Sequence, residues 1–159
     1  MAANTLPFEF GNKSASTVHL SDIGNVYFSG ALAYRLVRVV TTALLLTAQG
    51  KLIDENSSTT LTYSTSALAA VTSAKVLGLA STAQVSLNIG DFFLVQVQGV
   101  GIVTGANTVT VGTGVTAAAG GLVTNVAGTF AATVPSTIVG TALATVAGAN
   151  ATIRLQNLI

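Results

Sequence analysis

The clearest strand pattern in the chain lies at residues 92–99, Phe92-Phe93-Leu94-Val95-Gln96-Val97-Gln98-Gly99. Aromatic and β-branched residues dominate it, as they dominate β-strands. In an extended chain the even-numbered residues Leu94, Gln96 and Gln98 share one face, and the odd-numbered apolar residues share the other. This alternation predicts a half-buried strand in an antiparallel sheet.

The residues directly before this strand predict a turn. The sequence Asn88-Ile89-Gly90-Asp91 contains Asn and Gly, which tolerate positive φ. We expect the Asp91 carboxylate to accept hydrogen bonds from backbone amides of this turn.

Further strands are predicted upstream, where short runs rich in apolar, aromatic and β-branched residues occur at 24–28, 34–40, 76–80 and 85–87. The run at 41–48 fits either a short helix or a continued strand, because so short an apolar run has no decisive period. Residues 56–75 are rich in Ser and Thr, which predicts a solvent-facing strand pair or loop.

Downstream of residue 99, glycines recur at irregular intervals between short runs of Thr, Val and Ala. We expect these glycines at the turns and bulges of a curved sheet. Many short strands broken by turns are typical of a sandwich or a barrel. The predicted fold class is therefore all-β (mainly β): a small antiparallel β-barrel or β-sandwich with an extended N-terminal arm and little helix.

The length of 159 residues suits one domain. Residues 1–16 are predicted to be an extended arm, because Pro7 favours an extended path. Phe8 and Phe10 would then point to the same side. The arm either tucks onto its own core or docks on a neighbouring subunit, and residues 17–159 are predicted to form a single β-rich domain.

Charge is scarce and unevenly placed. Charged residues make up 7% of the chain, against about 25% in an average soluble domain. Of the six basic and five acidic residues, only Arg154 lies beyond Asp91. Such a chain must present Thr, Ser and Asn to water or bury much of its surface against other chains, as charge-poor subunit interfaces do.

The same composition disfavours several partners. The net charge of +1 comes without a basic cluster, which predicts no binding to nucleic acid. No window offers about 20 predominantly large apolar residues, and the N-terminus lacks the pattern of a secretory signal, so no membrane partner is expected. The absence of cysteine excludes disulfides and thiolate metal sites, and it fits synthesis in a reducing cytosol.

No catalytic constellation is visible in the sequence. His19 is the only histidine, and the adjacent carboxylates Asp54 and Glu55 would face opposite sides of a strand, next to a polar run that predicts a solvated turn. General acid–base catalysis needs two titratable groups in contrasting environments, and no phosphate-binding glycine motif occurs. We therefore predict no enzyme activity and no catalytic, cofactor-binding or metal-binding residues.

Two groups of residues are the candidate interface with a capsid or another subunit. The apolar residues of the arm, Leu6, Phe8 and Phe10, form one group. The other is the only close basic pair, Arg35 and Arg38, whose side chains fall on opposite faces of a strand. We expect these two arginines to make salt bridges at the rim of the fold.

Three segments resemble the decoration proteins of tailed bacteriophage heads, also called cement or head-stabilisation proteins. They are Tyr34-Arg35-Leu36-Val37-Arg38 with the Ala/Thr/Leu stretch that ends in Gly50-Lys51-Leu52, then 90–99, then the Thr/Val/Ala/Gly-rich tail around Val139-Gly140-Thr141-Ala142-Leu143. The most specific is the second, which reads Gly-Asp-aromatic-x-x-Val-Gln-x-x-Gly. The resemblance covers roughly residues 24–156.

The resemblance implies a small β-barrel or β-sandwich that binds the outer surface of an assembled phage capsid and stabilises it by bridging capsomers. It implies the major capsid protein and further copies of the chain, as a homotrimer, as partners. The protein would lie on the virion after synthesis in the host cytoplasm. The family has no catalytic residues to carry over.

Two other virion roles are alternatives. A head-fibre, host-surface or glycan-binding module would need exposed aromatic side chains, and the chain has three tyrosines and no tryptophan. A major coat subunit would be larger and contain a long helix.

Overall fold

The computed structural model describes residues 20–46, 50–56, 63–65, 67–69, 75–80, 84–125, 138–147 and 150–156. The predicted arm, residues 1–16, lies outside this set. Within it the elements are η1 (Leu20–Asp22), β1 (Val26–Ser29), β2 (Leu32–Val39), β3 (Leu44–Leu46), β4 (Lys51–Asp54), β5 (Ser64–Thr65), β6 (Ala67–Leu68), β7 (Val76–Ala80), β8 (Gln84–Leu87), β9 (Phe92–Thr104), β10 (Gly114–Ala118), η2 (Ala119–Gly121), β11 (Leu122–Asn125), β12 (Gly140–Ala142) and β13 (Asn150–Leu155).

The all-β prediction is confirmed. Helix occurs among the described residues only as two 3-10 turns of three residues each. Eleven strands form one sheet, in which β11-β10-β12-β13-β9-β7-β4-β6 run side by side and β1, β2 and β5 join through β2. The strands pair antiparallel except for β2 with β5, and β3 with β8 forms a separate two-stranded sheet.

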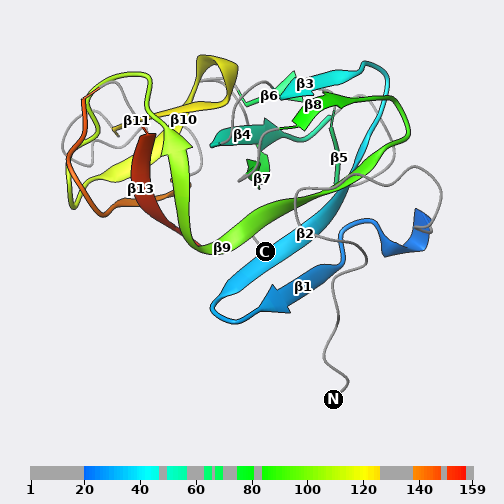
Figure 1. The fold of residues 1–159 in the computed structure, drawn as a ribbon, viewed down its shortest axis with the longest axis horizontal. Helices are drawn as coiled ribbons and strands as arrows, with labels where there is room; N and C mark the ends of the chain where they lie inside the picture. The colour runs from blue at the N-terminus through cyan, green and yellow to red at the C-terminus, as the bar shows by residue number, and fades with distance from the viewer. Residues whose placement is uncertain are drawn as a thin grey trace.

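The strand β9 connects the two halves of the molecule. Its residues up to Gln98 pair with β2, and from Gly99 onward they pair with β13. Figure 1 shows β9 running from the side of β1 and β2 towards β10, β11 and β13. The predicted strand at 92–99 is therefore present, and it continues to Thr104.

Glycines set the bend at which β9 changes partner. Gly99 has a φ of +97°, and a Cβ there would lie 2.5 Å from the Leu32 Cδ2 atom of the adjacent hairpin. A Cβ on Gly101 would lie 2.6 Å from Leu79 Cδ2. Only glycine avoids both the strained φ and these close approaches, which agrees with the expectation that glycines shape a curved sheet.

The prediction that this strand is half-buried is wrong, because residues 92–97 are buried on both faces. One face packs with Val37 and Val39 of β2, and the other packs with Tyr34 and Leu36. Gln96 is only 2% exposed, and its Nε2 donates hydrogen bonds to the backbone oxygens of Gln98 (3.2 Å) and Val100 (3.0 Å). A buried amide is tolerated because its donors are satisfied.

The C-terminal strands curl back towards β9. Gly105, which follows β9, forms an isolated parallel bridge with Val123 of β11, and the Ala106 amide donates to the Val123 oxygen at 2.8 Å. The two ends of the strand order also meet. Gly121, just before β11, donates its amide to the oxygen of Ala69, just after β6, at 2.8 Å. The curled sheet encloses an apolar cluster that includes Leu52 and Ile153.

The predicted turn before β9 is confirmed. The Asn88 amide donates to Asp91 Oδ2 at 2.8 Å, and the Asp91 amide donates to the Asn88 oxygen at 3.1 Å. Gly90 has a φ of +94°. The Asp91 carboxylate thus holds the turn as expected.

The segments at 41–48 and 56–75 differ in outcome. In the first, residues 44–46 form strand β3, so the strand alternative holds there. In the second, the expectation of a solvent-facing segment is wrong for Ser64, Thr65 and Ala69, which are buried. The reason is tertiary: β5 pairs alongside β2, with Ser64 opposite Arg38.

Candidate interaction surface

The structure places the predicted interface residues in different environments. Leu6, Phe8 and Phe10 lie outside the described residues. Arg35 is 3% exposed and therefore lies in the interior, whereas Arg38 is half-buried. The two arginines point to opposite faces of β2, as predicted, but the expected rim position is wrong for Arg35.

Arg35 lies over an aromatic ring. Its Cζ atom is 4.5 Å from the centre of the Tyr63 ring, which is a favourable cation–π distance. Burial lowers the pKa of the Arg35 guanidinium from its ordinary value, while Tyr63 and Glu55 act in the opposite direction. This arginine therefore packs against Tyr63 inside the single chain.

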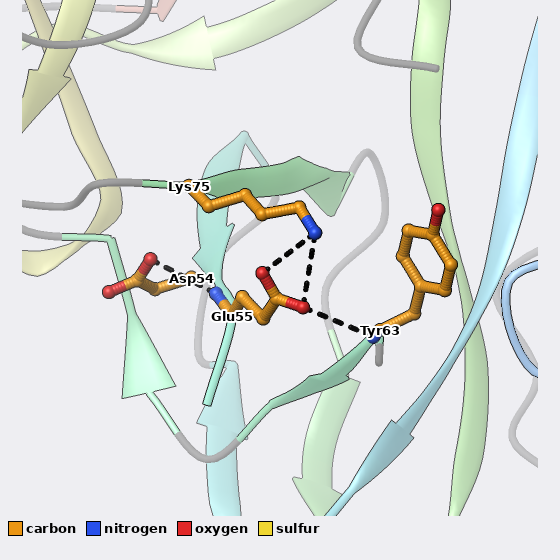
Figure 2. A network of polar contacts seen from close by, with 4 residues as sticks. All are labelled: Asp54, Glu55, Tyr63 and Lys75. Atoms are coloured by element: carbon orange, nitrogen blue, oxygen red, sulfur yellow. Dashed lines mark hydrogen bonds and ion pairs between the residues drawn. The ribbon is translucent and has the colours of Figure 1, made fainter. Parts of the chain in front are cut away.

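The ring of Tyr63 belongs to a polar network that ties separate segments together (Figure 2). Lys75 Nζ lies 2.9 Å from Glu55 Oε2 and 5.1 Å from the centre of the Tyr63 ring. Glu55 Oε1 accepts a hydrogen bond of 3.4 Å from the Tyr63 amide, and Asp54 Oδ1 accepts one of 3.0 Å from the Glu55 amide.

This network corrects the prediction for the adjacent carboxylates. The Glu55 side chain is 18% exposed and ion-paired, so it is not part of a fully solvated turn. Tyr63 has a φ of 61°, and a Cβ on Gly24 would collide with the Tyr63 ring. A residue held in this strained region persists only where its surroundings fix it, so Glu55 and Lys75 anchor Tyr63.

Arg38 has a simpler environment. It is the direct cross-strand partner of Phe92 in β9, and its Cζ atom lies 5.6 Å from the centre of that ring. Half-burial against an aromatic partner leaves it less available to a binding partner than a fully exposed arginine would be.

A different set of residues forms an exposed surface of the sheet that contains three large aliphatic side chains. We define the outer face as the solvent-side residues of β9, β13 and the end of β12: Val100, Ile102, Thr104, Asn150, Thr152, Arg154, Thr141 and Leu143. Strand register arranges most of them in two rows. Arg154 is paired with Val100 on one side and Thr141 on the other.

The second row is centred on Thr152. Thr152 is paired with Ile102 of β9. On its other side, the Leu143 amide donates to the Thr152 oxygen at 2.9 Å. Adjacent strands lie about 4.8 Å apart, so these residues form one continuous surface.

The outer face carries three exposed aliphatic side chains among polar residues, and one charge. Val100 and Ile102 are each 47% exposed, and Leu143 is 39% exposed. Arg154 is exposed between them and is the only charged residue of the face. The alternate residues of the same strands, such as Val103 and Ile153, are fully buried in the core behind it.

Sequence reasoning did not single out this face, although a local signal exists. In residues 150–155, Asn150, Thr152 and Arg154 alternate with three apolar residues, which is the period of a half-buried strand. Which strands lie beside it depends on long-range pairing that a single strand pattern does not encode.

The described residues contain no group of three or more His, Cys, Asp or Glu side chains that could hold a metal ion. No helix in the described part of the chain is long and apolar enough to cross a membrane.

These features define an all-β protein whose described charged clusters fasten its own segments and whose curled sheet presents an apolar outer face. No protein-family model matches the chain, and no curated protein matches it. Among solved structures, the chain is similar to the N base of head fiber gp8.5 of bacteriophage phi29. The sequence identity is 15%, the TM-score is 0.46, and the match covers 79% of this chain and 95% of that one.

Proposed function

We propose that the protein is a non-enzymatic structural component of a tailed-phage virion that binds the outer surface of the capsid and stabilises the shell by bridging capsomers. The observation that carries the proposal is the outer face: three large aliphatic side chains and a single arginine, exposed on one side of the sheet. Exposed apolar patches rimmed by polar residues are typical of protein–protein contact sites. The resemblance of residues 24–156 to phage decoration proteins supports the same role.

The chemistry of the surface fits docking to protein. The C-terminal half of the chain, beyond Asp91, contains one charged residue, Arg154. A surface of Thr, Val and Ala loses little solvation energy when it is covered, because few charges must be stripped of water. The partners in this proposal are the major capsid protein and further copies of the chain in a homotrimer, with neither nucleic acid nor membrane involved.

Shell stabilisation then follows from linkage. A protein that binds the assembled shell and not its separated subunits shifts the equilibrium towards assembly. Each bound copy that spans two capsomers adds to this shift. The proposed location is the capsid surface, reached after synthesis in the host cytoplasm.

The test uses purified shells that lack this protein. The wild-type chain should co-sediment with expanded shells in a saturable manner and raise the temperature at which they disrupt. Native mass spectrometry of the free protein should give three copies per particle. Failure to bind the shells at any accessible concentration would contradict the proposed role.

The same experiment separates the head-fibre alternative. A head-fibre or host-surface module would bind the shell without raising its disruption temperature, and it would also bind host cells or purified host glycans. Binding to cells by the isolated chain, with unchanged shell resistance, would favour that alternative.

A further inference from the structure

The geometry points to the outer face as the docking surface, and to a partner that is a different protein with a carboxylate opposite Arg154. This inference rests on the proposed function and specifies it: the shell must offer an apolar surface with an acidic side chain opposite Arg154. The contact with the partner is thereby assigned to exposed residues of β9 and β13 and at the end of β12. The earlier candidate Arg35 is buried and does not take part.

Arg154 lies in the row of the face at the Val100 end of the strands, with the row through Thr152 next to it. It has Val100 on one side and Thr141 on the other in its own row, and the row of Ile102, Thr152 and Leu143 lies beside it. Docking of a protein against these aliphatic side chains would remove water from the guanidinium. A desolvated arginine needs an acidic or other accepting partner, so the complementary surface must supply one.

A second copy joined through the same face would not supply it. In a two-fold contact the same patch of both copies meets, which brings Arg154 close to Arg154 of the other copy. Two like charges in a desolvated contact repel each other, and such contacts suppress the wrong partner.

The described part of the chain has no fully exposed acidic residue to offer a neighbouring copy. Of the acidic residues that the structure describes, none is fully exposed: Asp91 is buried, and Asp22, Asp54 and Glu55 are half-buried. Glu55 is also ion-paired with Lys75. Charge complementarity therefore favours a different protein over a neighbouring copy.

The composition of the face also selects protein over other ligands. It contains one cation, whereas nucleic acids are bound by clusters of Lys and Arg. It contains no aromatic ring on which a sugar could stack. The cores of protein–protein interfaces are poor in charged residues, but arginine is enriched there, which fits a face whose single charge is an arginine.

The test compares surface variants for binding to purified shells that lack this protein. Arg154→Glu should weaken binding about tenfold or more, because the new carboxylate would face an acidic partner. Arg154→Lys should keep most of the binding. Ile102→Thr should weaken binding about threefold or more through the loss of buried apolar area.

Ile89→Thr is the matched control. Ile89 is also an exposed isoleucine, 60% accessible, but it lies in the turn before β9 and not on the outer face. This variant should bind like the wild type. Circular dichroism and the unfolding midpoint of each variant would verify that the fold is retained.

The possible results separate a failure of the proposed docking surface from a failure of the proposed shell-binding function. If the wild type binds shells and Arg154→Glu and Ile102→Thr bind equally well, the inference is overturned while the proposed function stands. If Arg154→Glu instead changes the number of copies in the free particle, the face contacts a second copy and the inference also fails. If the wild type itself does not bind, both fail together.

Discussion

Buried Gln96 shows how one polar side chain shapes the central strand. Its amide donates to the oxygens of Gln98 and Val100, which lie on either side of Gly99, where the backbone turns to positive φ. The side chain therefore spans the bend of its own strand. These two hydrogen bonds satisfy the donors of an amide that is 2% exposed.

Replacing Gln96 should destabilise the fold. In Gln96→Leu the side chain keeps a similar size, but the two carbonyl groups lose their donors, and we expect a loss of about 1–3 kcal/mol in the free energy of unfolding. Urea denaturation followed by circular dichroism measures it. The control is Gln98→Leu at an exposed position of the same strand, where the expected change is within about 0.5 kcal/mol. Equal stability of Gln96→Leu and the wild type would contradict the role given to this amide.

Tyr34 gives a pH dependence at the residue scale. Burial raises the pKa of its phenol above the ordinary value of 10.0. The folded state therefore disfavours the ionised phenolate, so the contribution of Tyr34 is fully present below about pH 10 and is lost as the pH rises through the folded-state pKa.

We expect the unfolding temperature of the wild type to fall more steeply above pH 10 than that of Tyr34→Phe. The difference between the two proteins, measured at several pH values from 8 to 11, isolates this phenol from the other tyrosines. Parallel curves for both proteins would show that Tyr34 ionises equally easily in the folded and unfolded states.

At the scale of elements, the sequence pattern of a short segment was enough to predict some strands and turns. The strand at 76–80 has the predicted bounds, and the turn at 88–91 has the predicted cap. Burial was harder to predict. Gln96 was expected to face solvent, but its amide is buried and donates to backbone oxygens of its own strand. Ser64 was expected to be exposed, but β5 pairs with β2.

The candidate site was predicted less well than the fold. Arg35 was chosen for its charge, but the ring that covers it, Tyr63, is distant in sequence. The outer face combines strands from 100–104, 140–143 and 150–154, which meet only through the sheet order. A single sequence gives no register between such strands, so their common surface could not be deduced.

The predicted arm, residues 1–16, is an element that deletion would test. If the arm docks on a neighbouring subunit or the shell, the truncated chain should unfold at the same temperature as the full chain and bind shells more weakly. If the arm covers its own core, the unfolding temperature should fall as well, because apolar residues such as Phe8 and Phe10 would leave buried positions. Unchanged unfolding and unchanged shell binding would contradict both roles.

At the scale of the whole molecule, charge is divided between the two halves. Ten of the eleven charged residues lie at or before Asp91. Several of those described are engaged within the chain, such as Glu55 with Lys75 and Arg35 with Tyr63. The first half therefore uses charge to hold its segments in place, and the second half presents a nearly neutral sheet.

Because β9 borders β2 along its first part and β13 along its second, neither half can lose its strand ladder without disturbing a strand that the other half also uses. Heating should therefore melt the protein in one step, with the calorimetric enthalpy equal to the van't Hoff enthalpy. Two resolved heat-absorption peaks would contradict this. If the protein docks on a shell as proposed, tension applied to one half of the molecule would pass to the other half along the continuous backbone of β9.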